Sequence, residues 1–248
     1  MFYNKSSPRL PVTVRERSNP TPLSCRYLAT FCLVVVLLGR LGWSQEASED
    51  PHIAANEQLN VHWLYGAYVP KEAPLIPLTA RYRKKLFLRQ TLTTPGIYVK
   101  SGFLALIDQA RGTPYEWGGG AEGYGRRLTS NYARSAIQNV LSTVGNAALH
   151  YEPRYDRCRC IGFGRRTKHA LVRNFMTYDE TERELHPQFA LYSAALGAGM
   201  VSSVWKPQAK LWSEGYSGVL TQATFGMLSN WLGEFAPEIR RKLDHQKL

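Results

Sequence analysis

The stretch YGRRLTSNYARSAIQNVLSTVGNAAL, residues 124–149, decides the fold class. Its apolar and small side chains recur at every fourth position: Leu128, Tyr132, Ala136, Val140, Val144 and Ala148, with Ile137, Leu141 and Leu149 beside them. This period is typical of an amphipathic helix that buries one face. The stretch therefore predicts a long helix that ends before Pro153, because proline cannot continue a helix.

The segments around this helix also have helical patterns, and proline and glycine separate them. Thr94 followed by Pro95 is typical of a helix start, because proline is favoured at the first helical position. The expected helices cover residues 79–92, 94–112, 124–149, 167–177, 187–205 and 213–232. Hydrophobic residues make up 44% of the chain, which is enough to form a buried core. We therefore expect an all-α protein, a bundle of about five or six helices.

The chain is expected to be one helical domain that follows a targeting segment. Pro70, Pro74 and Pro77 exclude a long helix from the part before the domain. The expected divisions are a signal peptide or N-terminal anchor at 1–44, an irregular proline-rich arm at 45–77, the helical domain at 78–243 and a tail at 244–248.

The N-terminal segment has the composition of an export signal. Residues 1–26 are polar and basic, and an uncharged apolar run from Tyr27 to Gly39 follows them. The run is shorter than the roughly 20 residues that cross a membrane and fits the apolar region of a signal peptide. We expect cleavage after Ser44, with a retained N-terminal anchor as the alternative. Both predict an exported protein of the cell envelope, either periplasmic or membrane-associated.

The charge of the chain argues for an anionic partner other than nucleic acid. Lys and Arg number 31 against 19 Asp and Glu, a net charge of +12, and removal of 1–44 leaves +7. Much of the positive charge therefore belongs to the targeting segment, and an exported chain rarely meets nucleic acid. Membrane lipid or an anionic envelope polymer is the expected partner.

A basic segment at 154–173 supplies the candidate residues for binding an anionic surface: Arg154, Arg157, Arg159, Arg165, Arg166 and Lys168. Each such side chain contributes about 1 kcal/mol near an anionic membrane. The alternative is a solvated loop whose arginines pair with Glu180, Glu182 and Glu184.

Three stretches without charged residues raise the question of membrane insertion: 135–151, 185–205 and 215–233. The second stretch carries two rows of small residues four apart: Ala194, Ala198 and Ser202, and Ala195, Gly199 and Ser203. Small residues allow membrane helices to approach closely, so these rows are also candidates for self-association. A helical pair packed against the rest of the domain would show the same pattern.

Tryptophans mark the ends of these stretches, at Trp205, Trp212 and Trp231. Tryptophan is enriched at membrane interfaces, so these three are candidate interface anchors. Tryptophan at a helix end can also cover a protein core.

Motifs of enzyme chemistry are weak in this chain. Cys158 and Cys160 form a C-x-C pair, which we expect to be a local disulfide or a pair of thiols; a redox-active pair and a metal site are alternatives. His150 and His169 do not give a standard zinc spacing. The glycine-rich string at 118–127 lacks the Lys and Ser/Thr of a phosphate-binding loop. No metal and no cofactor are expected.

Several strings resemble an uncharacterised family of exported helical bacterial cell-envelope proteins. They are PLTAR at 77–81, EGYGRR at 122–127, PRY at 153–155 and the Ala/Gly-rich run before Trp205, and the resemblance covers about residues 75–243. It implies export and a helical fold, and it supplies no catalytic residue.

These observations favour a non-enzymatic exported cell-envelope protein that associates with the membrane through the Gly/Ala-rich helices of 185–233. The alternative is a soluble periplasmic enzyme or ligand-binding protein. Its site would lie near 116–127 or around Cys158, Cys160 and His169.

Overall fold

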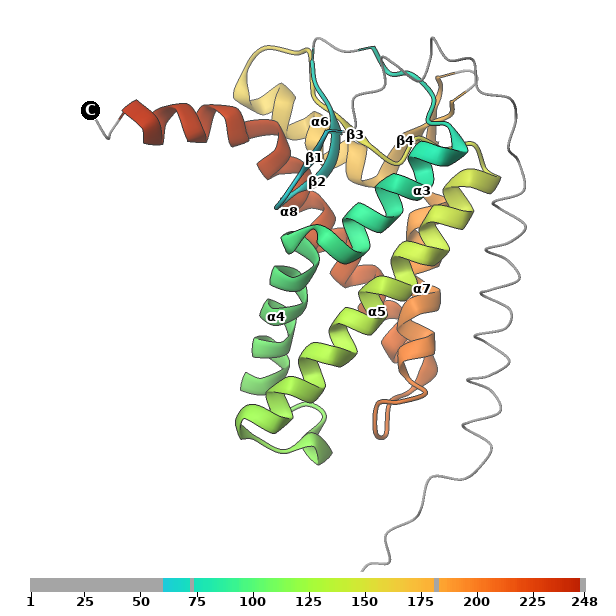
Figure 1. Ribbon diagram of the computed structural model, residues 1–248, viewed down its shortest axis with the longest axis vertical. Helices are drawn as coiled ribbons and strands as arrows, with labels where there is room; N and C mark the ends of the chain where they lie inside the picture. Colours follow the sequence, from blue (N-terminus) through green and yellow to red (C-terminus); the bar gives the residue numbers. More distant parts are fainter. Residues whose placement is uncertain (1–59, 72–73, 181–182, 246–248) are drawn as a thin grey trace, which may run out of the picture.

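The computed structural model describes residues 60–71, 74–180 and 183–245, and within them the all-α prediction is confirmed (Figure 1). The α-helices are α3 (Ala80–Leu88), α4 (Pro95–Ala110), α5 (Gly120–Ala148), α6 (Phe163–Phe175), α7 (Phe189–Ser202) and α8 (Leu211–His245). A turn of π-helix, Arg89–Thr93, joins α3 to α4, and a short 3-10 helix, Tyr115–Trp117, precedes α5. The expected export signal, its cleavage position and the N-terminal anchor lie outside the described residues.

The helix starts follow the local sequence signals. Thr79 caps α3, because its side-chain oxygen accepts a hydrogen bond from the Tyr82 amide at 3.5 Å. Thr94 is the N-cap of α4 and Pro95 its first residue, as predicted. The last helix differs from the prediction, because α8 continues beyond residue 232 to His245 with Pro237 inside it.

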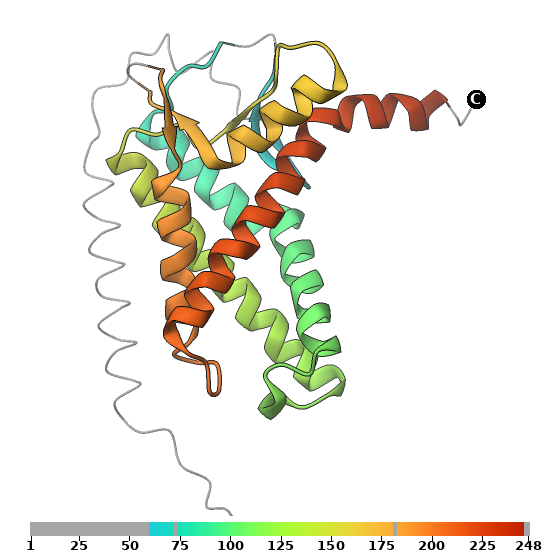
Figure 2. The same ribbon diagram turned by 180° about the vertical axis from the view of Figure 1, so that it is seen from behind.

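The centre of the bundle is α7, which packs against α5 on one side and α8 on the other (Figures 1 and 2). Backbones approach closely at these crossings. A Cβ atom on Gly199 would lie 2.2 Å from the Glu214 carbonyl oxygen, and one on Gly218 would lie 2.3 Å from that of Ala195. The small-residue rows of α7 therefore meet helices of the same chain.

The structure corrects one part of the prediction for 185–233, the membrane-spanning helix. Among the described residues, no helix combines the length and the apolar composition that crossing a membrane requires. The segment divides into a strand at its start, the short helix α7 and most of α8. The uncharged composition reflects the contacts of α7, whose Ala194, Ala195 and Ala198 are all buried in the bundle.

Short strands cover one end of the bundle, beside α6 (Figure 1). Strand β1 (Val61–His62) pairs antiparallel with β2 (Gly66–Val69), and β2 pairs in parallel with β3 (Tyr155–Asp156). Strands β4 (Met176–Tyr178) and β5 (Leu185–Pro187) form a second antiparallel pair. Part of the arm that was expected to be irregular is thus attached to the helical domain.

Candidate functional site

A cleft of about 520 Å³ lies between α3, α4, α5 and α8, and residues 152–155 also line it. Its volume is within the range of roughly 300–1,000 Å³ that small-molecule sites occupy. Amide side chains are unusually frequent in its wall: Gln90, Gln138, Asn139, Asn146, Asn174, Gln188, Gln222 and Asn230. The cleft therefore offers many hydrogen-bonding groups to a bound molecule.

Most charged side chains of the cleft wall already have ionic partners. Arg154 binds the Glu152 carboxylate, with Nη2 2.8 Å from Oε2. Arg83 forms an ion pair with Glu180, and Arg173 forms one with Asp156. The guanidinium charges of the wall are therefore neutralised within the protein.

Lys100, on α4, is the exception in the cleft wall. Among the described residues, no carboxylate forms an ion pair with its ammonium group, and its Nζ lies 5.5 Å from the centre of the Phe225 ring. Burial, reinforced by the nearby Arg134 guanidinium, lowers the pKa of Lys100 to about 8. Desolvation makes this cation costly unless an anion joins it, so Lys100 is a strong candidate for binding an anionic group.

Two of the glutamines are arranged as a pair across the cleft. Gln138 of α5 donates from Nε2 to Oε1 of Gln222 on α8, at 2.6 Å. The Gln138 oxygen and the Gln222 amino group make no hydrogen bond within the described residues. This pair can therefore accept one hydrogen bond from a ligand and donate others to it.

Apolar side chains flank the opening of the cleft. Val99 and Phe103 of α4 and Leu228 of α8 line it, and each is about half exposed. The Phe103 and Phe225 rings meet edge to face at 6.1 Å between centroids. The cleft therefore has amide groups and a lysine in its wall and apolar side chains at its rim.

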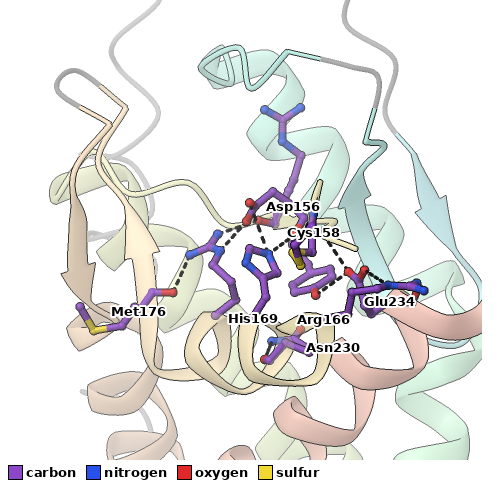
Figure 3. A network of polar contacts seen from close by, with 12 residues as sticks. Asp156, Cys158, Arg166, His169, Met176, Asn230 and Glu234 are labelled. Atoms are coloured by element: carbon purple, nitrogen blue, oxygen red, sulfur yellow. Dashed lines mark hydrogen bonds and ion pairs between the residues drawn. A yellow bond between two sulfur atoms is a disulfide. The ribbon is translucent and has the colours of Figure 1, made fainter. Parts of the chain in front are cut away.

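A network of buried ionic contacts holds the neighbouring end of the bundle together (Figure 3). Its centre is Glu234 of α8, whose side chain is 0% exposed. Glu234 Oε1 accepts from Arg166 Nε at 2.8 Å, while Oε2 accepts from the Tyr155 hydroxyl at 2.9 Å and the Cys158 amide at 3.0 Å. Burial and the Glu234 carboxylate raise the pKa of Tyr155. The network joins α6, β3 and α8.

The predicted basic surface is divided by these contacts. Arg154 and Arg166 are buried and bound to Glu152 and Glu234, so their guanidinium groups do not face outward. They act as internal ion pairs because each has a carboxylate within hydrogen-bonding distance. The pairing expected with Glu180 is absent for these two, since Glu180 binds Arg83; Glu182 lies outside the described residues.

The remaining predicted basic residues lie nearer the surface. Arg157 donates to the Tyr65 hydroxyl at 2.8 Å, and its guanidinium lies 4.3 Å from the centre of the Tyr68 ring. Arg159, Arg165 and Lys168 are exposed. Only part of the predicted set is therefore placed where it could meet an anionic surface.

The two cysteines are joined by a disulfide, which was one of the two outcomes expected for the pair. His169 is held by the backbone, with Nε2 2.9 Å from the Asp156 carbonyl oxygen. Within the described part of the chain, no group of three or more His, Cys, Asp or Glu side chains is arranged to hold a metal ion.

The other predicted site, near 116–127, is organised by a buried arginine. Arg127 donates to the backbone oxygens of Thr113, Pro114 and Gly118 and to the side chain of Gln109. Glu122 forms an exposed ion pair with Arg126, one turn along α5. The charged side chains near 116–127 therefore form contacts within the protein that hold the conformation of this loop.

The three tryptophans differ in their surroundings. Trp205 donates from its ring nitrogen to the Ser130 hydroxyl of α5 at 2.9 Å. Trp231 packs on Phe235, with 5.0 Å between ring centroids. Trp212 is 60% exposed, and it is the most exposed of the three.

Sequence reasoning missed Lys100, Gln138 and Gln222. One signal was present, since Lys100 is the only basic residue of the mostly apolar segment from Pro95 to Ala110. The two glutamines gave no signal, because they are 84 positions apart and only the fold brings them together. Comparisons with family models, with curated proteins and with solved structures give no match to this chain.

Proposed function

We propose that the protein binds an amphiphilic anion in the cleft, with a carboxylate or phosphate group on Lys100 and an apolar tail at the rim. The observation that carries the proposal is the ammonium group of Lys100, which has no carboxylate partner among the described residues of an otherwise neutralised cleft wall. An anion bound there offsets the free-energy cost of desolvating the Lys100 ammonium group. The glutamine pair supplies the hydrogen bonds that orient the anionic head.

Membrane lipid remains the expected source of the partner, but the proposed place of contact is the cleft and not the Gly/Ala-rich face of α7. The Gly/Ala-rich face of α7 is covered by α5 and α8, so it leaves no room for lipid. The cleft combines a cation, free amide groups and an apolar rim, which match the head and the tail of an amphiphile. This is binding chemistry, so the proposed protein is a lipid- or fatty-acid-binding component of the envelope.

Lys100→Met is expected to weaken binding of dodecanoate by about tenfold to a hundredfold, because a charge-assisted contact contributes about 1.5–3 kcal/mol. Methionine keeps an unbranched apolar stem and removes the charge. Isothermal titration calorimetry should compare dodecanoate below its micelle concentration with acetate and dodecanol. Dodecanoate should bind best, since acetate lacks the tail and dodecanol lacks the charge.

The matched control is Lys210→Met, which removes an exposed lysine outside the cleft. It should leave dodecanoate binding unchanged. Equal affinity of dodecanoate for the wild type and Lys100→Met, with both folded by circular dichroism, would rule out the proposed site.

Dodecanoate affinity is expected to fall as the pH rises above about 8. The free protein has Lys100 with a pKa of about 8, and a bound anion raises that pKa. Below pH 8 the lysine already carries its proton, so affinity is constant. Above pH 8 binding requires proton uptake, and the Kd rises by about tenfold per pH unit until the pKa of the complex is reached. Calorimetry at pH 9 in buffers of different ionisation enthalpy should show this uptake, and Lys100→Met should not show it.

A further inference from the structure

The disulfide between Cys158 and Cys160 lies on the loop that joins β3 to α6, and neither cysteine lines the cleft. A single residue, Arg159, separates the two cysteines. A disulfide that closes a longer loop removes more conformational entropy from the unfolded chain, so this one, which closes a very short loop, contributes less by that route. The disulfide therefore contributes little to the stability of the fold. Its chemical reactivity is the property that needs an explanation.

The two sulfur atoms differ in accessibility. Cys158 is buried, and its amide is fixed to the Glu234 carboxylate at 3.0 Å. Cys160 is partly exposed. An incoming thiolate therefore reaches the Cys160 sulfur first, and Cys158 becomes the leaving group.

The structure already supplies a hydrogen bond to the leaving sulfur. The Cys160 amide donates to Cys158 Sγ at 3.2 Å, where negative charge would develop when the disulfide opens. The exposed side chains of Arg165 and Lys168 add positive charge on the adjoining helix α6. Donors and nearby cations stabilise thiolates and thus favour exchange.

Two exposed apolar side chains follow the disulfide directly. Ile161 is 86% exposed and Phe163 is 65% exposed. An apolar surface beside a reactive sulfur suits a peptide that carries cysteines next to apolar residues.

We propose that Cys158 and Cys160 exchange their disulfide with a cysteine pair of a peptide or protein that docks on Ile161 and Phe163. A substrate thiolate attacks Cys160 Sγ, the bond between the two protein sulfurs breaks, and Cys158 leaves as a thiolate. The second substrate thiolate then attacks the substrate sulfur of the mixed disulfide and releases Cys160. The substrate loses two electrons and forms a disulfide, the protein pair gains them, and the two substrate protons end on Cys158 and Cys160.

The first test is reduction of the native protein by glutathione, followed by alkylation and mass spectrometry. The pair is expected to open in reduced glutathione alone while near-ultraviolet circular dichroism stays native. A disulfide that opens only after urea has unfolded the chain would be structural, and that result would overturn the proposal.

The second test uses single-cysteine variants to check the direction of attack. Cys158→Ser leaves the Cys160 thiol, which should form a mixed disulfide with oxidised glutathione about tenfold faster than the Cys158 thiol left by Cys160→Ser. Equal rates in the two folded variants would overturn the assignment of Cys160 as the attacked sulfur.

The third test separates docking from chemistry. Ile161→Ser should slow oxidation of a dithiol peptide with apolar flanking residues several-fold and leave the rate with glutathione unchanged. Leu220→Ser, at an exposed position on α8, is the control and should change neither rate. Equal peptide rates for Ile161→Ser and the wild type would contradict the proposed docking surface.

Discussion

Glu234→Gln is expected to lower the free energy of unfolding by about 3–5 kcal/mol, because it breaks a fully buried ion pair. The two carboxylate oxygens of Glu234 accept hydrogen bonds from Arg166, Tyr155 and the Cys158 amide. Glutamine has one oxygen, so its amino group would face a donor. Arg166 would also lose its buried ionic partner and keep only the ion pair with Glu238, whose side chain is 44% exposed.

Urea unfolding followed by circular dichroism measures this loss, and a melting curve should show a fall of about 2–4 °C per kcal/mol for a chain of this size. Glu238→Gln is the matched control. Glu238 binds the same Arg166 guanidinium, at 2.6 Å, but its side chain is 44% exposed. Its loss should cost about 0–1 kcal/mol. Similar losses in the two variants would show that burial of Glu234 is not what makes it important.

Gly199→Ala is expected to destabilise the protein by about 3 kcal/mol, the upper part of the usual range for overpacking. The new Cβ would lie 2.2 Å from the Glu214 carbonyl oxygen and 2.9 Å from the Gly215 Cα. Both are backbone atoms, so no side chain can rotate away to relieve the contact. Helices α7 and α8 would have to move apart along their whole crossing.

Gly197→Ala, two residues earlier on the same helix, provides the control. Its Cβ would lie 3.4 Å from the end of the Leu141 side chain, which is an ordinary contact. Alanine is a better helix former than glycine by about 0.5–1 kcal/mol, so this variant should be neutral or more stable. Urea unfolding of both variants measures the difference. A stable Gly199→Ala variant would contradict the close crossing of α7 and α8.

The helices could be predicted because their signals are local. The helical state of α5 and the Thr94-Pro95 start of α4 depend on neighbouring residues only. The buried face of α5 was predicted wrongly, because it carries polar residues such as Arg127 and Asn131 and none of the predicted apolar row. The end of α8 could not be predicted in this way, because Pro237 is a breaker in the sequence. In the fold, Glu234 and Phe235 are buried in the preceding turn, and these tertiary contacts outweigh the local preference.

The functional features depended on long-range partners that the sequence does not reveal. Arg166 is exposed or buried according to whether Glu234, 68 positions away, reaches it. The small residues of α7 satisfy the same steric requirement in a membrane and in a protein core, so composition alone could not distinguish the two. Lys100 became a candidate only when the surrounding guanidinium groups were seen to have carboxylate partners.

The pairing of Gln138 with Gln222 also determines at which stage of protein synthesis the cleft can form. Lys100 and Gln138 leave the ribosome well before α8, and Gln222 closes the opposite wall 84 residues after Gln138. At about 5–20 residues per second, the nascent chain spends several seconds without that wall. If the cleft binds the proposed ligand, binding should therefore begin only after α8 has been made and packed.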